Sequence, residues 1–149
     1  MKNLNIALAI LLGLSAFSAQ ASVANAEKLA LIYTSVAKSK NADFAPSVAD
    51  GKTFFTQKVK AANGKETACA SCHTANPADS GKNIVTGKKI PPLSPMVNNK
   101  RFSDYDKVEG QFTKHCNDIL GVDCSAADKA NYITYLLTEK TPTTTATKK

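Results

Sequence analysis

The stretch Cys69-Ala70-Ser71-Cys72-His73 decides how this chain can fold, because it has the form C-x-x-C-H. This spacing is the attachment signature of a c-type haem. The two thiols can each add to one vinyl group of the haem, and the next residue then presents its imidazole to the iron. In a chain of this composition the pattern arises by chance on the order of 10⁻³ times. We therefore predict one covalent haem c held by Cys69 and Cys72, with His73 as the proximal iron ligand.

Three other interpretations of the two cysteines remain open. A C-x-x-C redox site would use both thiols but would not need His73. A zinc site would need further ligands, and the spacing from Cys72 to Cys116 is poor for a zinc knuckle. A disulfide within the motif would be strained. A haem-free disulfide or zinc protein therefore stands as the competing hypothesis.

The segment around the motif lacks a side-chain core. Residues 67–95 contain few apolar side chains and many turn-forming residues, Pro and Gly above all. A stretch of this length is too long for an ordinary connection in a compact domain. A large flat apolar cofactor would replace the missing core, so we expect the chain to wrap round the haem here.

Helical periodicity flanks this segment on both sides. Apolar residues recur at helical spacing over four ranges, 27–37, 48–60, 103–119 and 126–137. Ser47 with Asp50 and Ser125 with Asp128 resemble capping boxes, and Ser103 is expected to start the third helix. No clear strand or repeat is present. We predict an all-α fold with long loops wrapped round one covalent haem.

The N-terminus has the features of an export signal. Lys2 precedes an apolar run over 6–17, and both Ala19-Gln20-Ala21 and Ala24-Asn25-Ala26 are small-x-small cleavage signatures. The run has about 12 residues, fewer than the roughly 20 that a membrane span needs. We expect cleavage after Ala21 or Ala26 and a soluble, periplasmic mature protein without stable membrane insertion.

The candidates for the second axial iron ligand are few. Apart from His73, the common neutral ligands left after export are His115 and Met96. His115 shares a helical face with Val108 and Phe112, so it is expected to face inward, either as an iron ligand or as a hydrogen-bonded core histidine. Met96 follows a stiff proline-rich segment and is the runner-up. A weaker Asn or Lys group, or no ligand, also remains open.

A second pair of cysteines lies close to His115. Cys116 and Cys124 are separated by a short loop that contains Gly121. In an oxidising compartment we expect them to form a disulfide, which would contribute about 2–3 kcal/mol to stability. The bridge would also fix the end of the helix that carries His115.

The chain of 149 residues is basic, with 19 Lys and Arg against 12 Asp and Glu and a formal net charge of +7. We expect no nucleic-acid partner, because no basic stripe is interleaved with aromatic residues. Basic residues at an exposed haem edge would steer an acidic redox protein. Those that flank the haem segment are Lys58, Lys60, Lys65, Lys82, Lys88, Lys89, Lys100 and Arg101.

Outside the motif, two patterns resemble known families. The pattern Gly51-x-x-Phe54-Phe55, followed by C-x-x-C-H and a last helix with Tyr135-Leu136, resembles class I cytochromes c. This resemblance implies that the first and last core helices cross in contact. It also implies that the carbonyl of Pro91 or Pro92 accepts from the His73 ring, and we take Pro92 as part of the haem site.

A longer pattern is similar to the sphaeroides haem protein family. It runs over Gly87-Lys-x-Ile90-Pro-Pro92-Leu93-x-Pro95, Arg101-Phe102-x-Asp104, Val108-Glu109-x-x-Phe112 and Cys116-x-Asp118-Ile-Leu-Gly121-x-x-Cys124. The resemblance implies a single-haem c-type cytochrome with a disulfide near the distal ligand. It also implies electron exchange with a dihaem cytochrome c and a membrane cytochrome b.

This chain departs from that family at one position. The family's distal ligand is an asparagine that leaves the iron on reduction, so that oxygen or nitric oxide can bind; here His115 stands there. Because imidazole is the stronger ligand, we expect a mono-haem electron carrier with His73 and His115 on the iron, rather than an enzyme. The alternative is a haem protein that binds or reduces oxygen or nitrogen oxides through a detachable His115.

The expected domain organisation follows from these features. It comprises a signal peptide at 1–26, an N-terminal helix and connector at 27–46, a cytochrome c domain at 47–140 and a disordered tail at 141–149.

Overall fold

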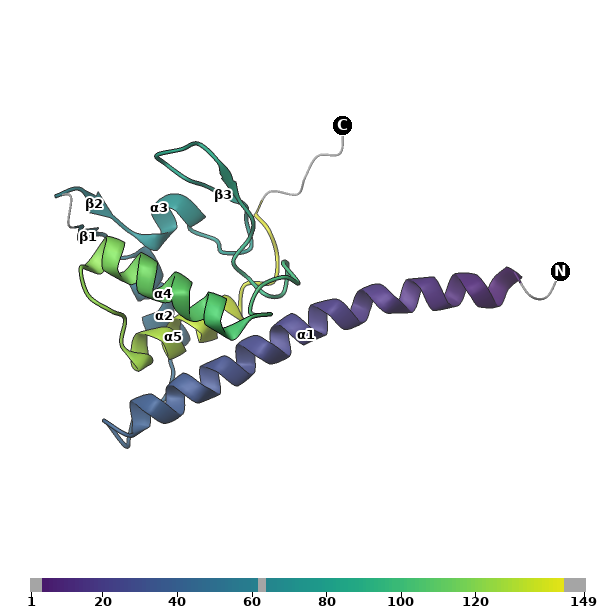
Figure 1. Cartoon of the computed structure of the whole chain (residues 1–149), viewed down its shortest axis with the longest axis horizontal. Coiled ribbons are helices and arrows are strands. Elements are labelled where there is room, and N and C mark those ends of the chain that lie inside the picture. The colour runs from purple at the N-terminus through teal and green to yellow at the C-terminus, as the bar shows by residue number, and fades with distance from the viewer. Residues whose placement is uncertain (1–3, 62–63, 144–149) are drawn as a thin grey trace.

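The computed structural model describes residues 4–61 and 64–143, with side chains placed from Ala21 onward. The helices are α1 (Leu4–Lys38), α2 (Val48–Thr56), α3 (Cys69–His73), α4 (Tyr105–Leu120) and α5 (Ala126–Leu136). Figure 1 shows these helices linked by long loops, so the predicted all-α class is confirmed.

Two short antiparallel ladders were not predicted. Strand β1 (Val59–Lys60) pairs with β2 (Glu66–Thr67), and β3 (Gly81–Lys82) pairs with β4 (Lys89–Ile90). The first ladder explains why the helix predicted over 48–60 ends at Thr56: the residues that follow extend to pair with β2.

Helix α1 is longer than the helix predicted over 27–37. It runs without a break from Leu4 through both predicted cleavage signatures, and its first half projects beyond the rest of the molecule (Figure 1). Residues 1–3 of the predicted signal lie outside the described residues. Within the described part of the chain, no helix is both long and apolar enough to cross a membrane.

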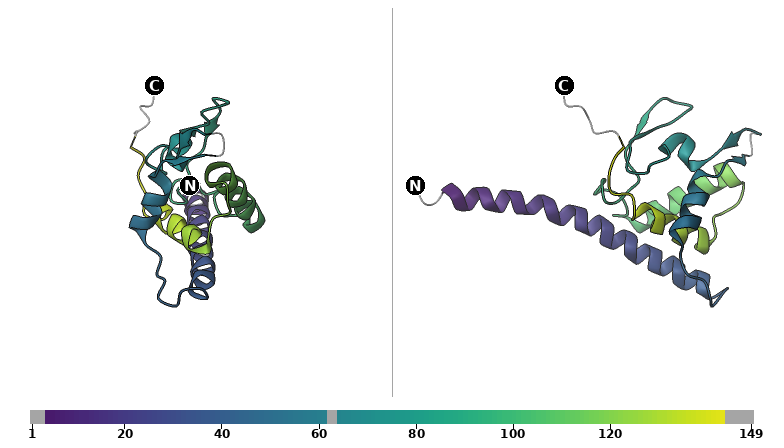
Figure 2. Two further views of the ribbon diagram at one scale, coloured as in Figure 1. Left: turned by 90° about the vertical axis from the view of Figure 1, so that its left-hand side faces the viewer. Right: turned by 180° about the vertical axis from the view of Figure 1, so that it is seen from behind.

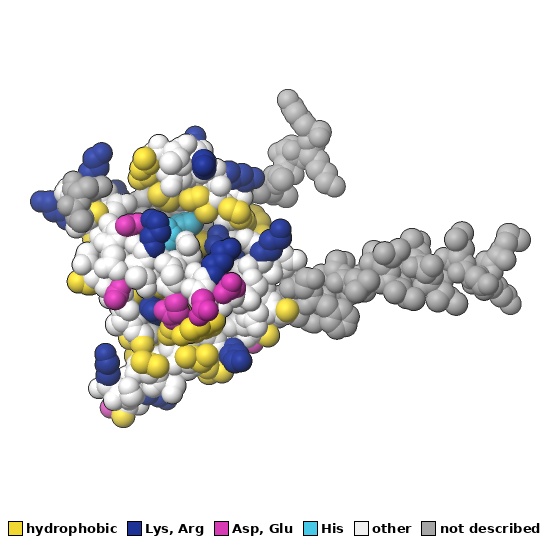
Figure 3. Space-filling view, viewed as in Figure 1, with side chains coloured by type: hydrophobic (Ala, Val, Ile, Leu, Met, Phe, Trp, Pro, Cys, Tyr) yellow, Lys and Arg dark blue, Asp and Glu magenta, His cyan; other side chains and the backbone are white. Residues whose placement is uncertain are grey.

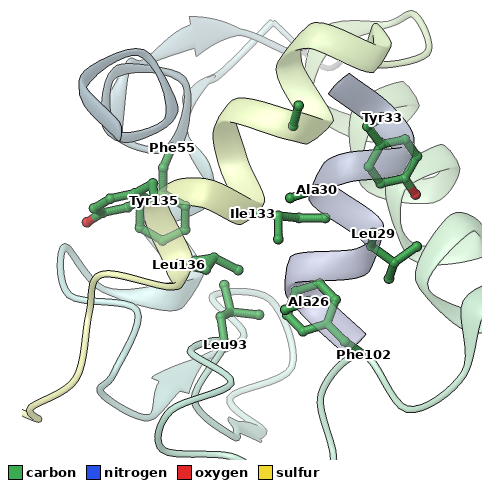
Figure 4. Close-up of a cluster of buried hydrophobic side chains, with 11 residues drawn as sticks. Ala26, Leu29, Ala30, Tyr33, Phe55, Leu93, Phe102, Ile133, Tyr135 and Leu136 are labelled. Atoms are coloured by element: carbon green, nitrogen blue, oxygen red, sulfur yellow. The ribbon is translucent and has the colours of Figure 1, made fainter. Parts of the chain in front are cut away.

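Helix α5 lies at the centre of the molecule and contacts both α1 and α2, as the views of Figure 2 show. Its residues Ile133, Tyr135 and Leu136 are almost fully buried. Figure 4 shows them meeting residues from the rest of the chain. The partners in this core are Ala26, Leu29, Ala30, Tyr33, Phe55, Leu93 and Phe102.

The crossing of α2 and α5 depends on a glycine. A Cβ added at Gly51 would lie 2.0 Å from the backbone oxygen of Asn131 and 2.8 Å from the Cβ of Tyr135. Only a residue without a side chain allows the two helices to come this close. The helix crossing implied by the resemblance to class I cytochromes c is therefore present.

The residue that caps the N-terminus of α4 lies one position later than predicted. The side chain of Asp104, rather than Ser103, accepts from the backbone N–H of Lys107 and caps the helix. Gly121 ends α4 in the left-handed conformation, with φ 75°. The predicted disulfide between Cys116 and Cys124 is present, with the two Cα atoms 5.6 Å apart.

The first residues of the predicted tail, 141–143, make hydrogen bonds to the rest of the chain. The backbone N–H of Thr143 donates to Asp79, and Asn76 donates to the carbonyl of Thr141. These hydrogen bonds tie the end of the described chain to the loop that follows His73. Residues 144–149 of the predicted tail lie outside the described residues.

Candidate haem site

Helix α3 presents the C-x-x-C-H motif as a single short turn. Its N-terminus is closed by the hydroxyl of Ser71, which accepts from the backbone N–H of Ala68. Cys69 and Cys72 are not joined in a disulfide, and both are partly exposed. Burial raises the pKa of the Cys69 thiol to about 11, opposite to the lowered pKa that a C-x-x-C redox thiol requires.

The two histidine rings lie against each other. The ring centroids of His73 and His115 are 6.3 Å apart, and the ring planes are nearly perpendicular, at 88°. A metal–imidazole bond is about 2 Å and a ring nitrogen lies about 1.2 Å from its ring centre, so two rings that share one metal ion have centroids roughly 6.4 Å apart. The spacing and the donor atoms therefore fit a haem iron between the rings.

Both rings are neutral at pH 7, which is the form that binds a metal. Burial, followed by the nearby charge of Arg101, lowers the pKa of His73 to about 4. Burial, followed by the charge of Lys114, also lowers the pKa of His115.

The prediction places His115 on the inner face of its helix, and the structure turns its ring toward His73. The residue of α4 that is buried among other side chains is the neighbouring Cys116. Figure 3 shows histidine, in cyan, among Lys and Arg side chains. Nε2 of His115 lies 3.2 Å from Oε1 of Gln111, one turn back along the helix.

The prolines after β4 are held by Arg101. Its Nε and the side-chain amide of Asn98 each donate to the carbonyl of Pro92, both at 2.9 Å, and its Nη2 donates to the carbonyl of Pro91. The sequence marks Arg101 as a surface charge and as part of the family pattern, but no sequence pattern shows that its guanidinium folds back onto a loop. The predicted contact between the Pro92 carbonyl and His73 stays a prediction.

The other candidate groups are placed less favourably. Met96, the runner-up ligand, lies in the loop between β4 and α4, whereas His115 is the ring that lies against His73. Among the described residues, no group of three or more His, Cys, Asp and Glu side chains is arranged to hold a metal ion.

Comparisons with known proteins place the chain in a family. The DUF1924 family, described as a domain of unknown function, matches residues 41–136. Cytochrome c″ of Methylophilus methylotrophus is 66% identical over 126 residues, which cover 84% of this chain and 88% of that protein. The cytochrome c-type protein SHP of Cereibacter sphaeroides is 32% identical over 93 residues, which cover 62% of this chain and 71% of that protein.

Solved structures agree with these relatives. The crystal structure of oxidized cytochrome c″ from Methylophilus methylotrophus superposes with a TM-score of 0.78, covering 81% of this chain and 99% of that one. A solution structure of the same protein, described as giving insight into haem-ligand detachment, has a TM-score of 0.76. Oxidized SHP, described as an oxygen-binding cytochrome c, is 27% identical, has a TM-score of 0.64 and covers 74% of this chain and 94% of that one.

Proposed function

This chain belongs to the family of c-type cytochromes that includes cytochrome c″ and SHP, and from this premise we propose that it is a periplasmic single-electron carrier. Its cofactor is one covalent haem c. The ligands we propose for the iron are His73 and His115. The observation that carries this assignment is the pair of facing rings, 6.3 Å apart between centroids.

Different residues of the site would attach the haem and bind its iron. Cys69 and Cys72 would hold the haem through thioether bonds, and His73 lies directly beside them on α3. When bound, the haem supplies a reversible one-electron change at its iron. An imidazole pair lowers the reduction potential relative to a His/Met pair, because methionine favours ferrous iron. The disulfide at Cys116 fixes the end of α4 next to His115.

A second candidate function is the binding of a small ligand such as oxygen or nitric oxide after His115 leaves the iron. One contact supports it: Oε1 of Gln111 lies 3.2 Å from Nε2 of His115 and offers the ring a partner other than iron. Among the relatives, one solved structure is described in terms of haem-ligand detachment and another as oxygen-binding.

Spectroscopy of the purified holoprotein tests the ligand assignment. Low-temperature EPR and near-infrared magnetic circular dichroism of the ferric protein should show a low-spin bis-imidazole iron. His115→Ala should convert the iron to high spin, whereas the control Met96→Leu should leave the spectra unchanged. A methionine charge-transfer band that disappears in Met96→Leu would instead move the ligand to Met96.

Carbon monoxide distinguishes the two candidate functions. If His115 stays on ferrous iron, the reduced wild-type protein should bind carbon monoxide slowly or not at all, as an electron carrier would. Rapid and tight binding would overturn the pure-carrier proposal and favour the second candidate. The reduced His115→Ala variant is the positive control. It lacks the sixth iron ligand whichever of the two candidate functions is correct, so it should bind carbon monoxide.

The proposal includes export and redox protein partners. The partners that the family resemblance implies are a dihaem cytochrome c and a membrane cytochrome b. The basic charge of the chain supports partners with an acidic surface.

A further inference from the structure

Strands β3 and β4 and the turn between them form a hairpin over residues 81–90. This hairpin lies in a segment whose charged residues are all basic. Five of the chain's 19 basic residues and none of its 12 acidic residues lie between Asp79 and Asp104. Three of the five are on the hairpin, and all three are exposed: Lys82, Lys88 and Lys89. The hairpin therefore presents a positive surface that an acidic protein would meet favourably.

The tip of the hairpin is apolar. Ile84 is 66% exposed and Val85 is 88% exposed, which makes Val85 the most exposed large hydrophobic residue among those described. An apolar centre with a charged rim is the usual composition of a protein–protein interface. Burial of these two side chains against a partner would add a hydrophobic contribution to the electrostatic attraction.

The turn holds this tip in one conformation. The side-chain oxygen of Asn83 accepts from the backbone N–H groups of Val85 and Thr86, at 2.9 and 2.8 Å. The backbone N–H of Asn83 donates to Lys88, and Gly87 closes the turn with φ 71°. Because the turn is already ordered, little conformational entropy is lost when a partner binds.

The base of the hairpin lies directly on the haem-attachment motif. A Cβ added at Gly81 would come within 2.2 Å of the backbone oxygen of Cys72 and 2.9 Å of the Cα of His73. A hollow of about 620 Å³ separates the motif from the turn, and its lining includes Cys72 and Val85. Figure 1 shows the hairpin beside α3. A protein docked on the tip would thus lie next to the cysteine that carries one edge of the haem.

From these four observations we propose that the 81–90 hairpin is the docking surface for an acidic redox protein. Lys82, Lys88 and Lys89 attract the partner, and Ile84 with Val85 forms the dry centre of the contact. The proposal rests on the electron-carrying function above and adds where the electron enters or leaves.

The test is the rate at which a reduced flavodoxin, used as an acidic redox probe, reduces the ferric holoprotein in stopped flow. The double variant Lys82→Glu/Lys88→Glu should lower the second-order rate constant about tenfold at low ionic strength and remove most of its salt dependence. Val85→Ser should lower the rate constant about threefold and leave the salt dependence unchanged, because it removes apolar area without altering charge.

Matched controls change the same residue types elsewhere. Lys28→Glu/Lys40→Glu on and just after α1 gives the same change of charge, and Val122→Ser removes a valine that is 61% exposed. The second-order rate constants of both control variants should stay within twofold of the wild-type value. Equal effects of hairpin and control variants would overturn the docking surface. A wild-type protein that dithionite cannot reduce reversibly would instead overturn the proposed function, and the docking surface with it.

Discussion

At the scale of single residues, two helical glycines have opposite surroundings. Gly51 in α2 lies against the backbone of Asn131 in α5, where an added Cβ would meet an oxygen at 2.0 Å. Gly110 in α4 has nothing within 4 Å of the corresponding position. The first glycine is required by the helix crossing, and the second is only a weak point in a helix.

The same substitution should therefore have opposite effects at the two sites. Gly51→Ala should lower the free energy of unfolding by about 1–3 kcal/mol, because the backbones of α2 and α5 must move apart. Gly110→Ala should raise it by about 0.5–1 kcal/mol through helix propensity. Thermal unfolding of the two holoprotein variants measures both. Equal shifts of Tm would contradict the close approach at Gly51.

At the scale of elements, α4 is held by a small number of side-chain contacts. Lys129 of α5 donates to Glu109 at 2.6 Å, and the hydroxyl of Tyr33 in α1 donates to the same carboxylate. The rings of Tyr33 and Phe112 meet edge to face, with centroids 5.9 Å apart. These contacts join α1, α4 and α5, and so they determine where α4 carries His115.

Glu109→Gln should weaken this junction. Burial alone would raise the pKa of Glu109, but the hydrogen bonds from Lys129 and Tyr33 lower it below its ordinary value. The carboxylate therefore stabilises the fold fully above about pH 4.3, and this contribution is lost as the pH falls below that value. We expect the variant to be less stable by about 1–2 kcal/mol at pH 7, with the difference shrinking toward pH 3.

The control is the exposed ion pair between Lys114 and Asp118 on the outer side of the same helix. Solvent screens this pair, so Asp118→Asn should leave the Tm at pH 7 unchanged within error. Thermal unfolding at pH 7 and pH 3 provides the measurement. A Glu109→Gln effect that persists at pH 3 would show that the carboxylate charge is not what holds α4.

At the scale of the whole molecule, the core includes residues from the beginning of the predicted mature chain. Ala26 is fully buried, and Ser22, only 2% exposed, donates its hydroxyl to the carbonyl of Arg101 at 2.7 Å. Cleavage after Ala26 would remove both residues from the folded protein. Cleavage after Ala21 would keep both residues and would remove the projecting half of α1 from the mature protein.

We therefore expect the exported protein to begin at Ser22. Intact-mass measurement of the periplasmic protein should give the mass of residues 22–149 with one covalent haem and one disulfide. A mature chain that begins at Glu27 would show that the contacts of Ser22 and Ala26 are not needed for the fold.

Several features were predictable because they depend on residues close together in the chain. The haem-attachment motif, the caps at Ser47 and Ser125 and the Cys116–Cys124 disulfide each follow from a local pattern. The start of α4 shows the limit of such patterns, since Ser103 and Asp104 are both good caps. The structure uses Asp104, while the Ser103 hydroxyl donates to the carbonyl of Lys100.

The sequence by itself determined the covalent cofactor chemistry, the helical class and the family, because local spacing and helical periodicity encode them. Only the tertiary structure decided that His115 faces His73, that Arg101 holds the proline loop and that Thr143 is tied to Asp79. The first and the last of these contacts join residues that are distant in the chain, and the second folds a guanidinium back onto a loop nine residues earlier. Such contacts depend on how whole helices and loops pack against one another. Hydrophobic periodicity in a sequence indicates only that one face of a helix is buried, and does not show which residues cover it.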